Sequence, residues 1–456
     1  MLESCWNPME PIQANLNKLS NDFQEWKSIT VESVTKKKME LLARLGGIQR
    51  NLQTNRRSRF MVRLEGELQN ELAHILKAEE LMWFQRFRAR WLVDSDRNTR
   101  YYHLKPITRR RYNKILMLRN VHGQWVEGSV VLKQMANDFY KMLFSAGGNI
   151  MSWFQTKLTF PRLSQEEIEQ IRLEIEDDEV KRAVFSMSPW KALGPDGFLA
   201  GFYQKSWQTV GRSVGDFVKQ AWSNPLILRE VNCNDICLIP KVEHPKYIQQ
   251  FRPISLCNTL YKIVSKVLTN RIKNTITKVV SPHQTGFIPG RSIHENIVVA
   301  QEMAHTMCQM QGKVGYFAIK VDLSKACDRL NWSFIHHTLM EVGYPKEWVD
   351  LVMTSVTSVR TNVKWNGERA EYFHPQCGIW QGDPISPYLF VICMDKLSHM
   401  ILQGVQDGDW KPMRAGRNGP LISHLMFADD LILFAEATTT AQMNIVLRAP
   451  TSIKPI

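Results

Sequence analysis

The chain of 456 residues has no apolar run long enough to cross a membrane. Its longest apolar candidate, Pro387 to Met394, is too short and is followed directly by Asp395 and Lys396. The N-terminus has no basic segment that leads into an apolar one, which argues against a secretory signal. We therefore expect neither a membrane span nor a secretory signal.

Cysteine pairs with the spacing of a zinc site are also missing. Of the eight cysteines, only Cys233 and Cys237 lie close together, and no second pair is nearby. We expect free thiols in a reducing compartment. The chain has no internal repeat and no low-complexity segment. Its length, with 44% hydrophobic and 22% charged residues, is typical of a globular protein with two or three domains.

Basic residues outnumber acidic ones, which gives a net charge of +14 and a pI of about 9.4. This balance favours an anionic partner, with nucleic acid the first candidate and a membrane surface the second. Residues 100–120 contain no acid, and their basic residues alternate with aromatic ones. Such a segment can neutralise phosphates and stack on bases, although a solvated basic loop is the alternative. The residues predicted to contact nucleic acid here are Arg109, Arg110, Arg111 and Lys114.

Apolar residues recur at helical spacing over residues 1–90, as at Leu41, Leu45 and Ile48. We expect helices there, with Gly46-Gly47 breaking the first of them. A short hairpin leading into a helix is predicted near residues 123–132. An acidic pair of helices that starts near Ser164 is predicted over residues 161–187. From about residue 186 the pattern mixes strands and helices.

The tetrad Phe427-Ala428-Asp429-Asp430 interrupts two short apolar runs, so it predicts a hairpin with two carboxylates at its tip. Adjacent carboxylates repel each other, and a hard divalent cation would remove that penalty. A plain polar turn is the alternative interpretation. The pair therefore indicates half of a metal site only if another carboxylate joins it.

Asp322 is the best candidate for that third carboxylate, because Phe317–Asp322 has the pattern of a buried strand that ends in an acid. Two metal ions held by such acids can activate an attacking hydroxyl and stabilise a leaving phosphate oxygen. Between these acids in the sequence lies a loop that contains Gln381 and Gly382 and turns into a helix. Glycine at position 382 permits a close backbone approach.

These elements, in this order on a basic chain, resemble the reverse transcriptase of non-LTR (LINE-type) retrotransposons, especially the plant lineage. The resemblance covers roughly residues 80–435. It is carried by the motifs Trp91 to His103, Lys191 to Gly197, Leu238 to Lys241, Phe251 to Asn258, Tyr261-Lys262, Gln284 to Arg291, Asp322 to Asp328, Gln381 to Phe390 and Phe427 to Asp430. The resemblance implies an RNA-directed DNA polymerase that uses an RNA template, a DNA primer and dNTP.

The resemblance also implies roles for single residues. Asp322, Asp429 and Asp430 would be the catalytic carboxylates and would hold two Mg²⁺ ions, with Mn²⁺ as a substitute. The residues implied to bind the nucleotide are Lys241, Arg252, Cys327, Gln381 and Gly382. Arg291 would contact nucleic acid. Surface or structural roles are the alternatives for Lys241, Arg252 and Arg291.

Two positions depart from the family pattern. Cys327 stands where the family has an aromatic residue that excludes the ribose 2′-hydroxyl, and Trp380 stands where it has arginine. The resemblance also ends after about residue 441, so we expect the next palm motif and the thumb to be missing.

The expected fold class is α+β, with the fingers and palm of a right-hand polymerase preceded by an N-terminal helical region. The predicted divisions are a basic helical region over residues 1–90, a basic extension over 91–185, fingers and palm over 186–441, and a divergent tail over 442–456. An active polymerase, an inactive nucleic-acid-binding remnant and a structural protein acting through its N-terminal helices are the three functions considered. Nuclear location is expected by analogy.

Overall fold

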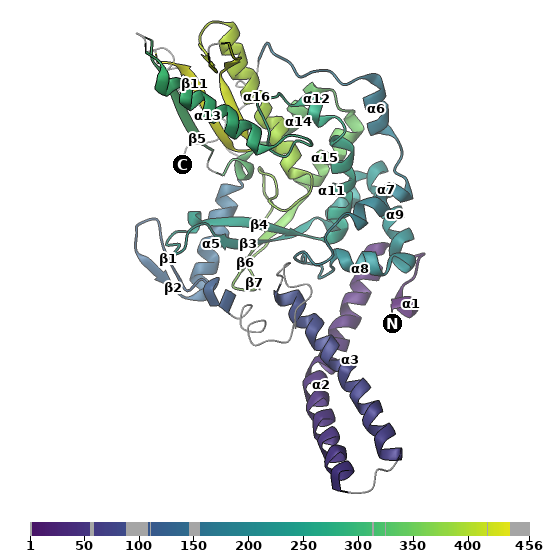
Figure 1. Ribbon diagram of the computed structural model, residues 1–456. Coiled ribbons are helices and arrows are strands. Elements are labelled where there is room, and N and C mark those ends of the chain that lie inside the picture. Colours follow the sequence, from purple (N-terminus) through teal and green to yellow (C-terminus); the bar gives the residue numbers. More distant parts are fainter. Residues whose placement is uncertain are drawn as a thin grey trace. The chain divides into compact units, whose positions relative to one another are not determined.

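The computed structural model describes residues 2–54, 59–87, 108–109, 111–145, 156–311, 314–323, 325–416 and 418–437. The chain divides into two compact units (Figure 1). The N-terminal unit comprises Met1–Ile115 with Pro189–Lys191, and the C-terminal unit comprises Leu116–Ser188 with Ala192–Ile456. The motif over residues 91–103, Arg110 and the tail from residue 442 lie outside the described residues.

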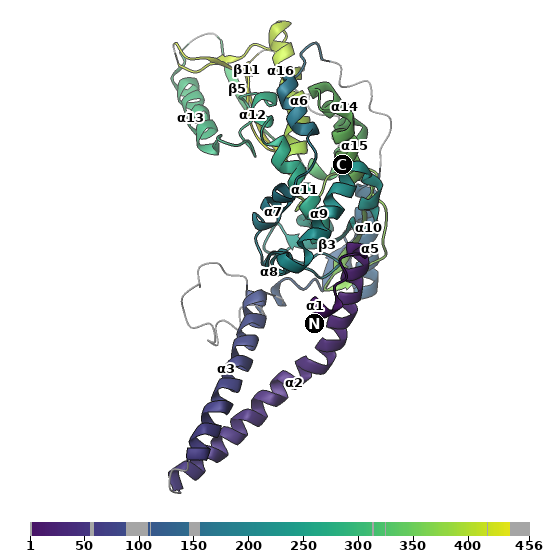
Figure 2. The same cartoon turned by 90° about the vertical axis from the view of Figure 1, so that its right-hand side faces the viewer.

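The N-terminal unit consists of α1 (Leu2–Cys5), α2 (Ile12–Thr54) and α3 (Arg59–Phe87). The two long helices form a hairpin (Figure 2). Leu41, Leu45 and Leu68 form a small buried core between them, and Lys38 pairs with Glu79 at 2.6 Å. The helical pattern over residues 1–90 therefore predicted these elements correctly.

The predicted break at Gly46-Gly47 is wrong, because α2 continues through both glycines. Glycine in a helix interior costs about 1 kcal/mol relative to alanine. Leu45 and Ile48, on either side of the glycines, pack into the contact with α3. This packing offsets the weak helix propensity.

The C-terminal unit mixes helices and strands, so the prediction of an α+β fold is confirmed. Its helices are α5 (Ser129–Leu143), α6 (Gln165–Arg172), α7 (Asp177–Phe185), α8 (Ala200–Lys205), α9 (Trp207–Ser223), α10 (Leu228–Val231), α11 (Thr259–Ile272), α12 (Ile276–Val279), α13 (Ile293–Gln309), α14 (Trp332–Val342), α15 (Lys346–Thr357) and α16 (Ser386–Gln406). Its strands are β1 (Met117–Arg119), β2 (Trp125–Glu127), β3 (Cys233–Pro240), β4 (Phe251–Cys257), β5 (Tyr316–Asp322), β6 (Arg360–Trp365), β7 (Glu368–Arg369), β8 (Met413–Arg414), β9 (Leu421–Ile422), β10 (His424–Phe427) and β11 (Asp430–Glu436). None of the helices in the described residues is long and apolar enough to span a membrane.

Local signals account for several of these elements. The hairpin of β1 and β2 leads into α5, as predicted. The acidic helical pair is α6 and α7, and Ser164 begins α6 with a capping box in which its hydroxyl accepts from Glu167 N. Proline at position 387 lies in the first turn of α16, where the missing N–H has no intrahelical partner in any case.

Two sheets carry Arg252, Asp322 and Asp430. One has the order β4-β3-β6-β7, in which β3 runs antiparallel to β4 and parallel to β6. The other has the order β10-β11-β5, with both pairs antiparallel. Helix α13 lies against this second sheet (Figure 1). Its Met303 packs with Leu425 and Phe434 of the sheet. That contact buries one face of the sheet.

The prediction of a buried strand ending at Asp322 is half right. The strand exists as β5, but it lies at the edge of its sheet and its residues are exposed or half-buried. Ile319 and Val321 are half-buried, whereas Lys320 and Asp322 alternate with them on the exposed side. The acid therefore projects from a strand with one open face.

Candidate active site

The tetrad at residues 427–430 forms the predicted hairpin tip. Phe427 pairs with Asp430 across β10 and β11, which leaves Ala428 and Asp429 as a two-residue turn. Ala428 has a φ of 55°, a left-handed conformation that alanine adopts rarely. This backbone conformation determines where the chain places Asp429.

Asp322 lies directly opposite Asp430 in the register of β5 and β11. Residues opposite each other in an antiparallel pair project to the same face, so both carboxylates lie on one side of the sheet. Lys320 lies two residues earlier on that face, and its Nζ is 3.1 Å from Asp430 Oδ1. The fold thus brings together two acids separated by more than a hundred residues.

Asp429 completes the group of acids. Burial raises the pKa of Asp429, and the neighbouring charges of Asp430 and Asp322 raise it further, while Lys241 opposes them. Among the described residues, no three His, Cys, Asp or Glu side chains form a ready-made metal site. The donor chemistry nevertheless fits Mg²⁺, because carboxylate oxygens suit a hard cation and a cation would relieve this mutual repulsion.

Lysines lie next to these acids. Lys241 follows β3, and its N–H donates to Gln250 O at 2.8 Å. Lys325 has a φ of 57°, and burial lowers its pKa to about 8. Arg252 is exposed on β4, opposite Ile239 of β3. The structure places Lys241 in the electrostatic field of Asp429 and places Arg252 on the same hairpin as Lys241.

Asp328 belongs to this neighbourhood and was not predicted as a site residue. Burial raises its pKa to about 6, while Lys325, Lys241 and Arg329 oppose the shift. Its signal in the sequence is its place in the motif that begins with Asp322. Cys327, next to it, is half-buried, and burial followed by the charges of Asp328 and Asp429 raises the pKa of its thiol to about 12. The thiol is therefore neutral at physiological pH.

The loop with Gln381 and Gly382 packs against β4. Ser255 N donates to Gln381 O at 2.8 Å, and Gly382 has a φ of 125°. A Cβ at position 382 would lie 2.6 Å from Ser255 O, so only glycine fits this approach. Trp380 is buried, with its ring centroid 5.5 Å from that of Phe144. Trp380, at the position where the resemblance implies arginine, is thus part of the core.

Asp383 anchors this loop and was missed by the sequence reasoning. Its carboxylate is buried and accepts hydrogen bonds from Tyr261 at 3.1 Å, Ser386 at 3.3 Å and Ser265. Burial raises its pKa, and these donors oppose the shift. Three donors from α11 and α16 therefore fix the loop, which no local sequence pattern could show.

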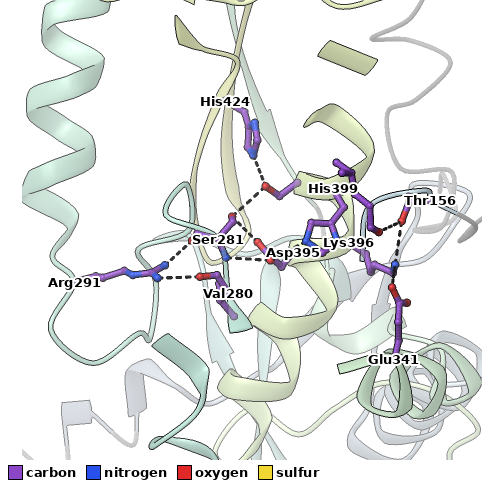
Figure 3. Close-up of polar contacts among 11 residues, drawn as sticks. Thr156, Val280, Ser281, Arg291, Glu341, Asp395, Lys396, His399 and His424 are labelled. Atoms are coloured by element: carbon purple, nitrogen blue, oxygen red, sulfur yellow. Dashed lines mark hydrogen bonds and ion pairs between the residues drawn. The ribbon is translucent and has the colours of Figure 1, made fainter. Parts of the chain in front are cut away.

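The side chain of Arg291 makes hydrogen bonds within the fold. Its guanidinium donates to the backbone carbonyl oxygens of Thr277, Val280, Ser281 and Gln284, at distances of 2.5–3.0 Å. Figure 3 shows the bonds to Val280 and Ser281. These bonds close the loop after α12. The predicted contact of Arg291 with nucleic acid stays a prediction, as do those of Arg109, Arg111 and Lys114, which are exposed in the N-terminal unit.

A sheet that presents carboxylates from one strand and from the neighbouring hairpin turn, with lysines nearby, is similar to the palm of a nucleic-acid polymerase. Residues 239–449 match the family model described as reverse transcriptase (RNA-dependent DNA polymerase). The match contains every predicted catalytic and nucleotide-binding residue.

Curated relatives of the chain are proteins of transposable elements. The chain is 26% identical over 313 residues to the transposon TX1 uncharacterized 149 kDa protein of Xenopus laevis, covering 68% of this chain and 24% of that protein. It is 32% identical over 207 residues to the Pol polyprotein of the retrotransposable element R2DM of Drosophila melanogaster, covering 45% and 18%. Residues 239–449 are therefore similar to reverse transcriptases, and the matched relatives are proteins of transposable elements. The chain spans about a quarter of the length of the Xenopus relative.

One further relative and one solved structure are also similar. An uncharacterized mitochondrial protein of Arabidopsis thaliana is 42% identical over 65 residues, covering 14% of this chain and 53% of that protein. A chain of Candida albicans telomerase, solved in a complex with a fragment of telomeric RNA, is 13% identical with a TM-score of 0.35, covering 55% of this chain and 44% of that chain. The fold assignment rests on the elements described above.

Proposed function

We propose that the chain contains the fingers and palm of a non-LTR retrotransposon reverse transcriptase of the plant lineage. It would extend a DNA primer on an RNA template by transferring nucleotides from dNTP. The observation that carries this proposal is the pairing of Asp322 with Asp430 beside Asp429 at the hairpin turn.

Asp322, Asp429 and Asp430 would hold two divalent cations at this turn. When bound, such ions lower the pKa of the primer 3′-hydroxyl and stabilise the leaving phosphate oxygen. The protein itself supplies position and charge, which is most of what phosphoryl transfer requires. Asp322 and Asp430 share one face of the sheet, so they can serve the same reacting group.

Cations beside the carboxylates would receive the triphosphate. Lys241 lies in the field of Asp429, and Lys325 and Arg329 lie around the buried Asp328. A phosphate group prefers such a set of donors because charge-assisted hydrogen bonds are stronger than neutral ones. Arg252, on the same hairpin as Lys241, would reach the same nucleotide.

The remaining site residues would contact the base pair and the strands. Gln381 and Gly382 are exposed on a loop that is fixed to β4, so they would line the nascent base pair. Cys327 would lie near the sugar. The exposed Arg109, Arg111 and Lys114 would neutralise template phosphates, and the element would act in the nucleus.

Primer extension on an RNA template with Mg²⁺ tests the proposal. We expect the wild-type chain to incorporate dNTP and Asp429→Ala to lose about 100-fold or more of that activity, because small errors of position already cost this much. Asp216→Asn is the matched control, since Asp216 is exposed on α9 in the same unit.

The alternative function predicts a different result in the same assay. An inactive remnant would bind RNA with a steep dependence on salt and would incorporate nothing. Absence of incorporation by the wild-type chain would overturn the polymerase proposal. Equal incorporation by the wild-type and Asp429→Ala chains would overturn the assignment of the site.

A further inference from the structure

The backbone of Ala428, directly before Asp429, is held by a single side chain. Gln284 Oε1 accepts a hydrogen bond from Ala428 N at 2.8 Å, and Gln284 Nε2 donates to Ala428 O at 3.3 Å. Gln284 is fully buried, with 0% of its surface exposed, and Oε1 also accepts from Gly286 N at 2.8 Å. One amide therefore satisfies both polar groups of the residue whose φ is 55°.

A left-handed conformation at alanine persists only where the surroundings determine it. Here the loop around Gln284 is pressed against the hairpin. A Cβ on Gly286 would lie 2.4 Å from Ala428 N, so only glycine allows this approach. Met426 N donates to His283 O at 2.8 Å, and Thr285 N donates to Met426 O at 3.0 Å. The loop thus follows β10 up to the turn.

Both the loop and the hairpin are attached to α16 by hydrogen bonds (Figure 3). Ser281 donates to the buried carboxylate of Asp395 through its N–H at 3.1 Å and its hydroxyl at 2.6 Å. Ser398, also on α16, is hydrogen-bonded to His424 Nε2 of β10 at 2.7 Å. The amide of Gln284 therefore contacts the turn from a loop that has little freedom to shift.

We propose that Gln284 is a positioning residue for Asp429. Its amide holds Ala428 in the left-handed conformation, and this conformation presents the Asp429 carboxylate on the same side as Asp322 and Asp430. The inference rests on the proposed function, in which Asp429 binds the cation. A purely structural role for Gln284 is the alternative, and the two predict different effects on metal binding.

Gln284→Met keeps the length of the side chain and removes both of its polar atoms. We expect Mn²⁺ affinity, measured by electron paramagnetic resonance of the free ion, to fall about tenfold or more. We expect kcat in primer extension to fall about 100-fold with KM for dNTP nearly unchanged, because the misplaced group acts on the reacting atoms.

Gln204→Met is the matched control. Gln204 Nε2 donates to Val184 O at 2.9 Å and to Met187 O at 2.8 Å, in a half-buried setting outside the candidate site. This variant loses two side-chain bonds to the backbone, whereas Gln284→Met loses three. It should lower the thermal midpoint while leaving Mn²⁺ affinity and kcat at their wild-type values.

A double variant keeps the test decisive if Gln284→Met folds poorly. Glycine adopts the left-handed conformation without steric cost, so adding Ala428→Gly should stabilise the turn and recover several-fold of the lost Mn²⁺ affinity. Wild-type Mn²⁺ affinity in Gln284→Met, or no recovery in the double variant, overturns the positioning role alone. A wild-type chain that binds no Mn²⁺ overturns the proposed function and this inference with it.

Discussion

Lys320 and Asp430 form an ion pair of 3.1 Å on neighbouring strands, on the same face as Asp322. The lysine neutralises part of the carboxylate charge at the turn. A cation bound by Asp430 would therefore compete with the ammonium group of Lys320. The balance between them depends on the register of β5 and β11, which places the lysine within reach of the acid.

Lys320→Gln should lower the Mg²⁺ concentration that half-saturates primer extension. Both partners are more than half exposed, so the pair contributes little and we expect a shift of roughly two- to fivefold. A titration of incorporation rate against Mg²⁺ measures it. Lys411→Gln is the control, because Lys411 pairs with Glu436 at the other end of β11 at 3.3 Å. A higher Mg²⁺ requirement in Lys320→Gln would contradict the competition.

Sequence reasoning predicted the features that depend on local pattern. The hairpin tip at Asp429, the strand ending at Asp322 and the helix that begins at Ser386 follow from alternation and turn residues. The features it missed depend on packing between distant segments. The ion pair of Lys320 requires the register, and the contact of Gln284 with Ala428 joins residues 144 positions apart. No periodicity in one segment reveals either of them.

Burial explains the remaining differences between prediction and structure. Gly46-Gly47 signals a helix break locally, but the packing of α2 against α3 outweighs the cost. The apolar residues of β5 suggested a buried strand, whereas β5 lies at a sheet edge with one open face. In both cases the outcome depends on how neighbouring elements are arranged, which a local pattern does not show.

Cys327→Phe should increase discrimination against ribonucleotides. Cys327 lies in the field of Asp429, where the family resemblance implies an aromatic ring that excludes the 2′-hydroxyl. We expect the ratio of kcat/KM for dNTP to that for rNTP to rise about 10- to 100-fold. Single-nucleotide incorporation assays give both values. Cys308→Phe, at an exposed position on α13, should leave the ratio unchanged. An unchanged ratio in Cys327→Phe would place the sugar elsewhere.

Gly382→Ala should destabilise the loop against β4. The new Cβ would meet Ser255 O at 2.6 Å, in a backbone conformation already unfavourable for alanine. We expect the free energy of unfolding to fall by about 2 kcal/mol or more in a urea titration, with a loss of incorporation. Gly343→Ala separates backbone strain from the steric contact, because Gly343 has a φ of 93° but open space around it. Equal losses in both variants would mean that the contact with Ser255 adds nothing.

Arg291→Lys should lower stability without changing RNA affinity. Lysine cannot reproduce the four bonds to carbonyl oxygens, so we expect a loss of about 2–4 kcal/mol in the free energy of unfolding. Arg111→Gln should do the reverse, since Arg111 is exposed and predicted to contact phosphate. It should change stability by less than about 0.5 kcal/mol and reduce the salt slope of RNA binding by about 1. Weaker RNA binding by a fully stable Arg291→Lys chain would instead support a nucleic-acid contact.

Asp395→Asn should change the pH dependence of stability. Burial raises the pKa of Asp395 to about 6, while the hydrogen bonds from Ser281 and the charges of Arg291 and Lys396 oppose the shift. The folded state therefore binds a proton that the unfolded state releases between about pH 4 and pH 6, and wild-type stability falls as the pH rises through this window. The loss attached to this one carboxyl is about 3 kcal/mol, and it is complete above pH 6.

Asparagine does not titrate, so the variant lacks this loss. The free energy of unfolding of Asp395→Asn, measured relative to wild type, should rise by about 3 kcal/mol between pH 4 and pH 7. His399, whose Nε2 is 3.6 Å from Asp395 Oδ2, is present in both proteins, so most of its contribution cancels in the difference. Urea titrations at several pH values measure this difference. A constant offset between the two proteins across this range would show that Asp395 is already ionised at pH 4 in the folded chain.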